Sequence, residues 1–587
     1  MTREELIARL KGYEWTDFEC KKAQRSVPRD AYPTVSAFAN TQGGWLLFGV
    51  SEVDGSLQVS GVDGDAFDQV HDAFLTTLRS GQKLNHIIDA HPKVYELDGK
   101  RILAFFIPES DRHQKPVYLN GNPRDSYIRR AARDERMTNN ELQRFLRDAA
   151  QRPWDGEGLT DFPIDSSIDE ETLKWYQAQF YRRNDEQRQI DDPIEFLQEW
   201  NFIVHQAGDL VLTRAAIMLF GKDRCVRALL PRPVLDYQRI DTRFDDWSAD
   251  QRWHDRLVFE ENLFKAWRGL IAKYARIAEH PFKVDPATLR RNDDPPDYIA
   301  FREAAINLLI HQDYGDHHRK ASLKWYTDRI TFWNPGDAFA TTAQLMESNE
   351  KEIRNPLIVN AFRRIALSDQ AGTGIRAILR NWHELGRRPP EIKNDKAGKS
   401  FELVLRQEPL VTEAVKHFQA SLGVHLTPEQ ADVLALATDR PSLSRVDAAM
   451  VTGGNLKIAH DALEYLCHQQ LLTRLDDDTF TLTGLIRERL DQHEAVVRTG
   501  PDIPDAGTKL ALSGHQVEIL RKCLNEQAIL ELMAVTGRSD RTKFRHQVLN
   551  PLLEEGLIEM TIPDKPRSSK QKYRLTPKGK QYLEQNQ

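Results

Sequence analysis

Residues 35–50, VSAFANTQGGWLLFGV, change their pattern twice within one short stretch. The first residues are small or apolar and predict the end of a helix. Two consecutive glycines, Gly43 and Gly44, then predict a tight turn. The run WLLFGV is continuously apolar, which is typical of a buried strand. The stretch therefore predicts a helix, a glycine turn and an interior strand, within a strand-rich region that extends over roughly residues 13–150.

The charged stretch GYEWTDFECKK, residues 12–22, precedes this unit. In a strand, Glu19 and Lys21 are two residues apart and share one face. A carboxylate and a lysine on one face suit metal-dependent phosphodiester cleavage, because the carboxylate can hold Mg²⁺ or Mn²⁺ while the lysine steadies developing charge. A divalent ion needs further carboxylates, for which Glu14 and Glu52 are the candidates. The alternative is a surface strand with solvated charges.

The composition is that of a soluble, multidomain protein. The 587 residues, with 40% hydrophobic and 29% charged content, predict three to five domains. The net charge of −7 excludes a polycation that coats nucleic acid, so nucleic-acid contacts must come from local basic patches. The four cysteines form no C-x-x-C pair, which argues against disulfides and structural zinc and favours a cytoplasmic location. No run of about eighteen apolar residues is present, so no membrane partner is expected.

A second candidate site lies in FREAAINLLIHQDY, residues 301–314. On a helix, Glu303, Asn307 and His311 share one face, while the rest of the stretch is apolar. A carboxylate and an amide in this arrangement can activate water and bind the Mg²⁺ that bridges nucleotide phosphates. Downstream, DRITFWNPG (328–336) predicts a strand that ends in a tight turn, and the glycines of DQAGTGI (369–375) can bring backbone N–H groups to phosphate. The alternatives are a solvent-facing helix stripe and an ordinary loop.

The stretch AGKS at residues 397–400 does not make a phosphate-binding P-loop. Lys393 stands where a Walker A loop requires its first glycine, so the phosphate cradle cannot form. Without a Walker A motor, a helicase is excluded as well.

The N-terminal stretches EWTDFECKK, VSAFANTQGGWLLFGVSE and VSGVDG resemble the Schlafen AlbA_2 domain over roughly residues 13–145. The resemblance implies nucleic-acid binding and, in nuclease members, three carboxylates that correspond to Glu14, Glu19 and Glu52. This sequence has Cys20 where the family has Phe, and Ser51-Glu52 in place of its Asp-Asp. Local basic residues suit contacts to phosphate without reading sequence. These residues are Lys22, Arg25, Arg129 and Arg130.

Residues 296–407 resemble the GHKL ATPase fold, through REAAINLLIHQDY, DRITFWNPG, RNPLI and AGTGI in this order. The resemblance implies that Glu303 is the general base and Asn307 a Mg²⁺ ligand. It also implies that the turn at residues 334–336 shapes the adenine end and that residues 372–374 form a phosphate lid. Gln312 stands where the family has Arg. The ATP-binding residues implied in this way are Glu303, Asn307, His311, Asp313, Asn334, Gly336, Gly372, Thr373 and Gly374.

Beyond about residue 410, two segments share one plan of three helical stretches followed by short strands, which is the order of a winged helix. The last segment contains RSDRTKFRHQ (538–547) and TIPDKPRSSKQKYRLTPKGK (561–580), and it resembles the C-terminal winged helix that follows many such domain pairs. A recognition helix and a basic wing predict DNA contacts at Arg541, Lys543, Arg545, Lys570 and Lys572. The alternative is that both modules only contact protein.

We therefore expect a multidomain α/β protein. Its expected parts are an AlbA_2-like α+β domain at 1–150, a linker and connecting region at 151–295, a GHKL (Bergerat) α/β sandwich at 296–407, and winged helices at 408–495 and 505–587. The expected function is ATP-regulated, metal-dependent endonuclease activity on RNA or DNA, in defence or stress response, with Mg²⁺ or Mn²⁺ as cofactor and ATPase activity. A homo-oligomer, dimer or higher, is expected. The alternative function is a non-cutting, ATP-responsive transcriptional regulator.

Overall fold

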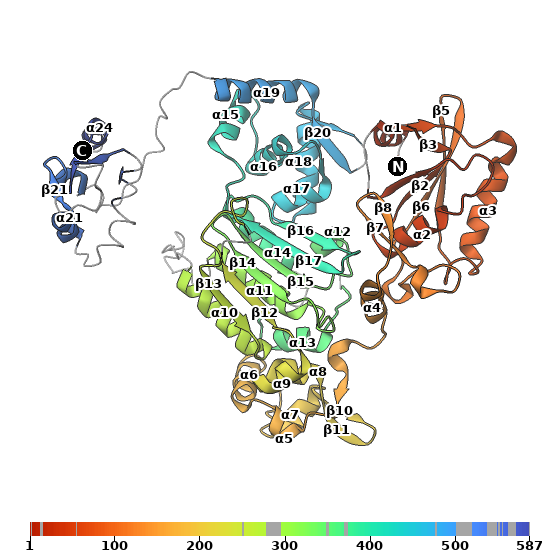
Figure 1. The fold of residues 1–587 in the computed structure, drawn as a ribbon, viewed down its shortest axis with the longest axis horizontal. Coiled ribbons are helices and arrows are strands. Elements are labelled where there is room, and N and C mark those ends of the chain that lie inside the picture. The colour runs from red at the N-terminus through yellow and green to blue at the C-terminus, as the bar shows by residue number, and fades with distance from the viewer. Residues whose placement is uncertain are drawn as a thin grey trace. The chain divides into compact units, whose positions relative to one another are not determined.

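The computed structural model describes residues 1, 3–11, 16–53, 56–248, 252–277, 295–347, 351–368, 374–475, 478–499, 519–536, 549, 552–553, 556–561 and 571–585. They form two compact units, residues 1–493 and 494–587. Several sheets and many helices make up a mixed α/β protein, which confirms the expected multidomain α/β class (Figure 1). None of the described helices is long and apolar enough to cross a membrane.

The N-terminal domain is built on a four-stranded sheet of order β1-β2-β6-β5. Strands β1 and β2 are parallel, and the other pairs are antiparallel. Two hairpins, β3-β4 and β7-β8, and four helices complete the domain. The elements are α1 (Arg3–Lys11), β1 (Phe18–Lys21), α2 (Ala31–Asn40), β2 (Gly44–Phe48), β3 (Val50–Val53), β4 (Ser56–Val59), α3 (Phe67–Arg79), β5 (His91–Leu97), β6 (Lys100–Ile107), β7 (Tyr127–Arg130), β8 (Arg133–Arg136) and α4 (Asn139–Asp148).

The predicted helix–turn–strand unit is present as α2, a turn and β2. Gly43 adopts φ +74, and a Cβ on it would lie 2.8 Å from the Ile107 carbonyl oxygen. A Cβ on Gly44 would lie 2.5 Å from the Phe38 ring. The buried Asn40 amide donates to the carbonyl oxygens of Val117 and Tyr127, each at 2.9 Å. The motif therefore anchors α2 and the β7 entry to the sheet, and both glycines are required by close packing.

The central domain is built on a six-stranded sheet of order β13-β12-β14-β15-β17-β16, in which only β12 and β14 pair in parallel. Helices α10, α11 and α14 pack in sequence beside one another (Figure 1). The elements are β12 (Leu235–Arg239), β13 (Asp255–Phe259), α10 (Leu263–Ile277), α11 (Pro296–Ile310), β14 (Ala321–Trp325), β15 (Arg329–Pro335), α12 (Thr342–Met346), α13 (Pro356–Arg364), α14 (Gly374–Glu384), β16 (Glu391–Asp395) and β17 (Ser400–Arg406).

The region before residue 296 shares the hydrophobic core of the central domain. Strands β12 and β13 belong to the central sheet, and the buried cluster runs from Ile168 to Leu405 without a break between the two regions. A smaller sheet of order β10-β11-β9 and several helices pack there. They are β9 (Gly158–Leu159), α5 (Ile164–Ser167), α6 (Glu170–Arg183), α7 (Pro193–Glu199), β10 (Ile203–Gln206), β11 (Asp209–Thr213), α8 (Arg214–Phe220) and α9 (Asp223–Leu229). The sheet therefore extends upstream of the expected boundary at 295/296, because its edge strands come from residues 235–259.

Two C-terminal modules share one sheet topology. In each, the first strand pairs with the third, and the third pairs with the second: β18-β20-β19 and β21-β23-β22. The first module contains α15 (Glu413–Ser421), α16 (Pro428–Asp439), β18 (Leu443–Ser444), α17 (Arg445–Val451), α18 (Leu456–His468), β19 (Leu472–Arg474), β20 (Thr479–Leu482) and α19 (Gly484–Thr499). The second contains β21 (Gln527–Ala528), α21 (Ile529–Thr536), β22 (Ile558–Met560), β23 (Lys572–Leu575) and α24 (Pro577–Gln585). The common order agrees with the internal similarity of the two segments, and their assignment as winged helices stays a prediction.

Candidate functional site

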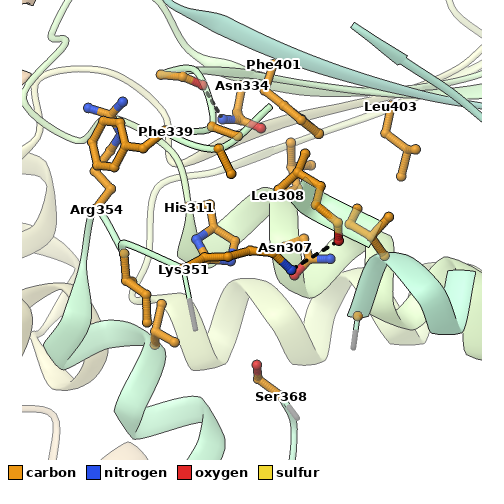
Figure 2. A pocket seen from close by; sticks show the side chains of 18 of the residues that line it. Asn307, Leu308, His311, Asn334, Phe339, Lys351, Arg354, Ser368, Phe401 and Leu403 are labelled. Carbon is orange, nitrogen blue, oxygen red and sulfur yellow. Dashed lines mark hydrogen bonds between the residues drawn. The ribbon is translucent and has the colours of Figure 1, made fainter. Parts of the chain in front are cut away.

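A pocket of about 430 Å³ opens in the central domain between α11, the end of β15, the segment 336–340, the segment 351–354 and the beginning of α14 (Figure 2). This volume lies in the usual range of small-molecule sites. Much of the wall is apolar. Its apolar residues include Leu308, Phe332, Leu345, Val359, Phe401 and Leu403. Apolar residues on the wall together with polar and charged ones suit a flat organic ring that carries a polar tail.

Helix α11 turns its polar stripe toward the pocket rather than toward bulk solvent. Glu303, Asn307 and His311 all line the cavity, and Glu303 is buried. Gly374, the first residue of α14, lies against this stripe. A Cβ on Gly374 would lie 3.2 Å from Asn307 Nδ2 and 3.5 Å from Glu303 Oε2. The carboxylate, the amide and the beginning of α14 thus converge at one end of the pocket.

His311 stands within the pocket, so solvent reaches its ring even though protein surrounds it. Burial and, to a smaller extent, the positive charge of Arg354 together lower the pKa of His311 to about 4. A neutral imidazole has one N–H donor and one acceptor nitrogen. His311 is therefore an uncharged hydrogen-bonding group in the pocket at neutral pH.

The other end of the pocket is the turn after β15. Asn334 donates from Nδ2 to the carbonyl oxygens of Pro335 (3.1 Å) and Gly336 (3.3 Å), so its amide holds the turn (Figure 2). Gly336 has φ +96, and a Cβ there would lie 3.0 Å from both Arg354 Nε and the Asp313 backbone nitrogen. The turn is therefore closely packed, and only glycine fits at its centre.

The structure brings six of the predicted ATP-binding residues to this pocket: Glu303, Asn307, His311, Asn334, Gly336 and Gly374. Asp313 does not line it, because its carboxylate accepts hydrogen bonds from Arg147 of α4 at 2.8 Å and from the Gly315 N–H at 2.9 Å. Gly372 and Thr373 lie outside the described residues.

Among the polar and aromatic pocket residues that sequence reasoning missed are Asp337, Phe339, Lys351 and Arg354. Asp337 directly follows the recognised stretch DRITFWNPG, and Arg354 opens the stretch RNPLI, but neither residue had an assigned role. Lys351 donates to the carbonyl oxygens of Leu345 (3.1 Å) and Glu347 (2.8 Å), which fixes this side of the rim.

The second predicted site, on β1, has its central carboxylate enclosed by cations. Lys21 Nζ lies 2.9 Å from Glu19 Oε1, and Arg129 Nη2 lies 2.9 Å from Glu19 Oε2. Lys21 also pairs with Asp30 at 2.9 Å. Burial alone lowers the pKa of Lys21, but its contacts with Glu19 and Asp30 raise it overall. Lys21 and Glu19 therefore form a charged pair on one face of β1, as the two-residue spacing predicts.

The described residues contain no group of three or more His, Cys, Asp or Glu side chains that could hold a metal ion. Glu52 lies exposed on β3, and Glu14 lies outside the described residues. Both Glu19 oxygens are already paired with cations. The side chains of the described part of this edge therefore do not by themselves make a metal site.

The basic residues predicted for nucleic acid are placed in different surroundings. Lys22 and Lys572 are exposed. Arg25 is exposed and pairs with Asp63 at 2.6 Å, while Arg130 pairs with Glu135 and Glu141. The Arg129 side chain is 3% exposed and also pairs with Asp134, so it braces the sheet edge rather than facing solvent. Arg541, Lys543, Arg545 and Lys570 lie outside the part of the chain that the structure describes.

Four protein-family models match the chain. "Schlafen, AlbA_2" matches residues 14–138, and "Putative ATP-dependent DNA helicase recG C-terminal" matches residues 318–405. "Filamentation induced by cAMP protein Fic-like, C-terminal domain" matches residues 515–576, and a domain of unknown function, DUF8451, matches residues 143–236. These matches define a protein with a Schlafen AlbA_2 domain and an ATPase-like domain. ATP and nucleic acid are accordingly the ligands with which this combination of domains is associated.

Three solved structures are similar to the chain. The DIP2311 protein from Corynebacterium diphtheriae is 19% identical over 96% of this chain and 95% of its own, with a TM-score of 0.37. The N-terminal domain of a RecG-related protein from Nitrosomonas europaea is 26% identical over 24% of this chain and 95% of its own, with a TM-score of 0.19. A Fic family protein from Desulfovibrio desulfuricans G20 is 21% identical over 40% of this chain and 72% of its own, with a TM-score of 0.11. No curated protein matches.

Proposed function

We propose that this protein binds ATP with Mg²⁺ in the α11 pocket and binds nucleic acid through its N-terminal domain. The observation that supports ATP binding is the convergence of Glu303, Asn307 and Gly374 at one end of a largely apolar pocket. The turn at residues 334–336 forms the other end and would receive the adenine ring. On this proposal the central domain is a GHKL-type ATPase.

The polar groups of the pocket have distinct proposed roles. The Asn307 amide oxygen would hold Mg²⁺, which when bound offsets the negative charge of the phosphates. The Glu303 carboxylate would accept a proton from the attacking water, which makes it the general base. The beginning of α14 offers backbone N–H groups, which suit a phosphate.

Titration calorimetry with ATP and with a non-hydrolysable analogue tests ATP binding. Asn307→Ala is expected to weaken binding of the Mg²⁺ nucleotide about ten- to a hundredfold, because the proposed Mg²⁺ ligand is lost. Glu303→Gln is expected to bind ATP but to lose about a hundredfold in hydrolysis rate, because the general base is removed. Gln187→Ala, on an exposed loop, is the control. If the wild-type protein binds no adenine nucleotide, the proposal is wrong.

The cleavage expected from Glu14, Glu19 and Glu52 is the more specific part of the proposal. Purified protein is incubated with tRNA, single-stranded DNA and duplex DNA, in Mg²⁺ or Mn²⁺. Cleavage that Glu19→Gln abolishes and Asp89→Gln leaves unchanged supports a nuclease, since Asp89 forms an exposed ion pair elsewhere in the same domain.

A non-cutting transcriptional regulator is the second candidate, and the pairing of both Glu19 oxygens with cations favours it. On this alternative the C-terminal modules are winged helices that bind a specific DNA sequence, and the N-terminal domain binds nucleic acid without cleaving it. Absence of cleavage on every substrate, together with tight binding to one promoter fragment, would support the regulator and reject the nuclease.

A further inference from the structure

Helix α4 of the N-terminal domain contacts the central domain at the rim of the pocket beside α11. The C-terminal half of α4 carries three charged residues that pair with the central domain. Arg144 Nε lies 3.1 Å from Asp316 Oδ2, and Arg147 Nη2 lies 2.8 Å from Asp313 Oδ2. Asp148, the last residue of α4, pairs with Arg354 of the pocket wall. Residues three and four apart share one helix face, so this face of α4 is committed to the central domain.

Arg354 connects Asp148 to the turn at the end of the pocket. Its guanidinium pairs with Asp148 and, at 3.2 Å, with Asp337 Oδ1. Lys399 closes the network, because its Nζ lies 3.2 Å from Asp148 Oδ2 and 3.4 Å from Asp337 Oδ2. The side chains of Asp148, Arg354, Asp337 and Lys399 are 5%, 11%, 1% and 4% exposed. Such a buried network is stable only while every charge keeps its partner.

The charged groups of this network shift one another's pKa values. Burial alone raises the pKa of Asp148, but Arg354 and Lys399 lower it well below its usual range. Burial alone lowers the pKa of Arg354. Nearby carboxylates raise it above its ordinary value, and Asp148 makes the largest of these contributions. Neutralising Asp148 therefore leaves Arg354 and Lys399 buried with one carboxylate fewer, and we expect Arg354 to move.

Movement of Arg354 would be transmitted directly to the pocket. A Cβ on Gly336 would lie 3.0 Å from Arg354 Nε, so the guanidinium rests on the backbone of the turn. A second anchor lies beside the first: Arg112 of the N-terminal domain pairs with Glu352 and donates to the backbone carbonyl oxygen of Asp148. The guanidinium carbons of Arg112 and Arg354 lie 4.7 and 4.5 Å from the centre of the Phe339 ring. Phe339 and Glu352 both line the pocket.

We propose that Asp148 is a positioning residue of the nucleotide pocket: through Arg354 it holds the turn at residues 334–337, so that nucleotide affinity depends on the docked N-terminal domain. The proposal rests on the ATP site proposed above. Because linkage is reciprocal, nucleotide binding stabilises the docked position of α4 to the same extent. The nucleic-acid-binding domain and the nucleotide pocket are thereby coupled within one chain.

The first test measures the affinity of full-length protein for AMP, ADP and the non-hydrolysable ATP analogue by titration calorimetry. Asp148→Asn is expected to weaken all three about five- to tenfold, which lies within the usual range of coupling between sites. The loss should be equal for the three nucleotides, because the turn holds the base end and not the phosphates. Asp89→Asn, which removes a carboxylate from the exposed pair with Arg79, is the matched control and should bind like the wild type.

A second measurement separates positioning from general destabilisation. Hydrogen exchange of residues 139–148 is followed with and without the ATP analogue. In the wild type and in Asp89→Asn, nucleotide should slow exchange of α4, whereas in Asp148→Asn this nucleotide-dependent change should be lost. Asp148→Glu, which keeps the charge, should restore part of it. If Asp148→Asn does not fold, Arg112→Gln is used in its place. It removes the ion pair with Glu352, and it should weaken nucleotide binding and abolish the nucleotide-dependent change in exchange in the same way.

The outcomes separate the two proposals. Wild-type protein that binds no nucleotide overturns both of them. Nucleotide binding that is equal in the wild type, Asp148→Asn and Arg112→Gln overturns the coupling alone. A loss that grows with the number of phosphates also overturns it, because Arg354 would then be a phosphate ligand and not a support of the turn.

Discussion

Gly44 illustrates how a single residue is specified by packing. The glycine pair at residues 43–44 is visible in the sequence as a turn, but its two members serve different purposes. Gly43 supplies a positive φ and a close approach to the Ile107 carbonyl oxygen, whereas Gly44 leaves room for the Phe38 ring. Because the second requirement is a contact between α2 and β2, local conformational preference alone could not distinguish the two glycines.

Gly44→Ala is expected to lower the free energy of unfolding of the N-terminal domain by about 1–3 kcal/mol, because a Cβ at 2.5 Å from the buried Phe38 ring overpacks the core. Urea unfolding followed by tryptophan fluorescence measures the loss. Gly99→Ala is the control. Its Cβ would have no neighbour within 4 Å, so it bears only the cost of a positive φ, on the order of 1 kcal/mol. Equal losses in the two variants would contradict the packing explanation.

Asp155 is a buried carboxylate that caps the N-terminus of α13, a helix about two hundred residues further along the chain. Its Oδ2 accepts hydrogen bonds from the backbone N–H groups of Leu357 (2.8 Å) and Ile358 (3.0 Å) in the first turn of α13. Burial raises the pKa of Asp155 to about 6, although these N–H groups favour the ionised form. A raised carboxyl pKa in the folded state means that its stabilising contribution is complete below about pH 4 and is lost as the pH rises through about 6.

Asp155→Asn cannot ionise but keeps an oxygen acceptor for α13. The stability of the wild type relative to this variant should therefore fall between pH 4 and pH 7. Thermal unfolding of both proteins across this interval measures the difference. Asp155→Ala should be less stable than Asp155→Asn at every pH by about 1 kcal/mol, because it loses the cap. A constant difference between wild type and Asp155→Asn would show that Asp155 does not titrate in this interval.

Helix α14 contributes side chains to two hydrophobic cores, that of the central domain and that of the first C-terminal module. Its first residue, Gly374, meets Asn307 in the pocket, and Ile378 and Trp382 lie in the core of the central domain. Leu379 on the same helix belongs to the core of the first C-terminal module. The glycines of AGTGI predicted backbone N–H groups near phosphate, but the division of α14 between two cores depends on which domain packs on each face.

His383, near the end of α14, joins the helix to the first C-terminal module. Its Nε2 lies 2.9 Å from Asp432 Oδ2 of α16. The hydrogen bond to Asp432 raises the pKa of His383, while burial opposes the rise. A raised histidine pKa stabilises the folded state below about pH 6.5, and the contribution is lost as the pH rises through the folded-state value.

His383→Gln should therefore be less stable than the wild type at pH 5.5 by less than about 1 kcal/mol, because the pair is partly exposed. The difference should shrink as the pH rises toward 8.5, because the wild-type imidazole loses its proton. Thermal unfolding at both pH values measures it. His460→Gln, an exposed histidine on α18, should keep the wild-type profile. A difference that is larger at pH 8.5 would contradict the proposed role of the charge.

At the scale of the whole molecule, ATP is expected to drive self-association. ATPase domains of the proposed type often dimerise, and closure of a dimer would bring two N-terminal domains together. Sedimentation velocity of the full chain should show a larger species when Mg²⁺ and the non-hydrolysable ATP analogue are added. Asn307→Ala should remain unchanged by the analogue, since it lacks the proposed Mg²⁺ ligand. A monomer under both conditions would reject this prediction.

The amino-acid sequence alone was sufficient for features that depend on neighbours along the chain. The apolar run of residues 45–50, the glycine turn before it, and the spacing of Glu303, Asn307 and His311 are all local, because helix and strand periods decide which side chains share a face. Only the tertiary structure could decide that Asp148, Asp337, Arg354 and Lys399 meet at one rim, or that residues 235–259 supply the edge of the central sheet. Those contacts join segments separated by tens to hundreds of residues, and no periodic pattern encodes which buried charges will pair once the domains pack.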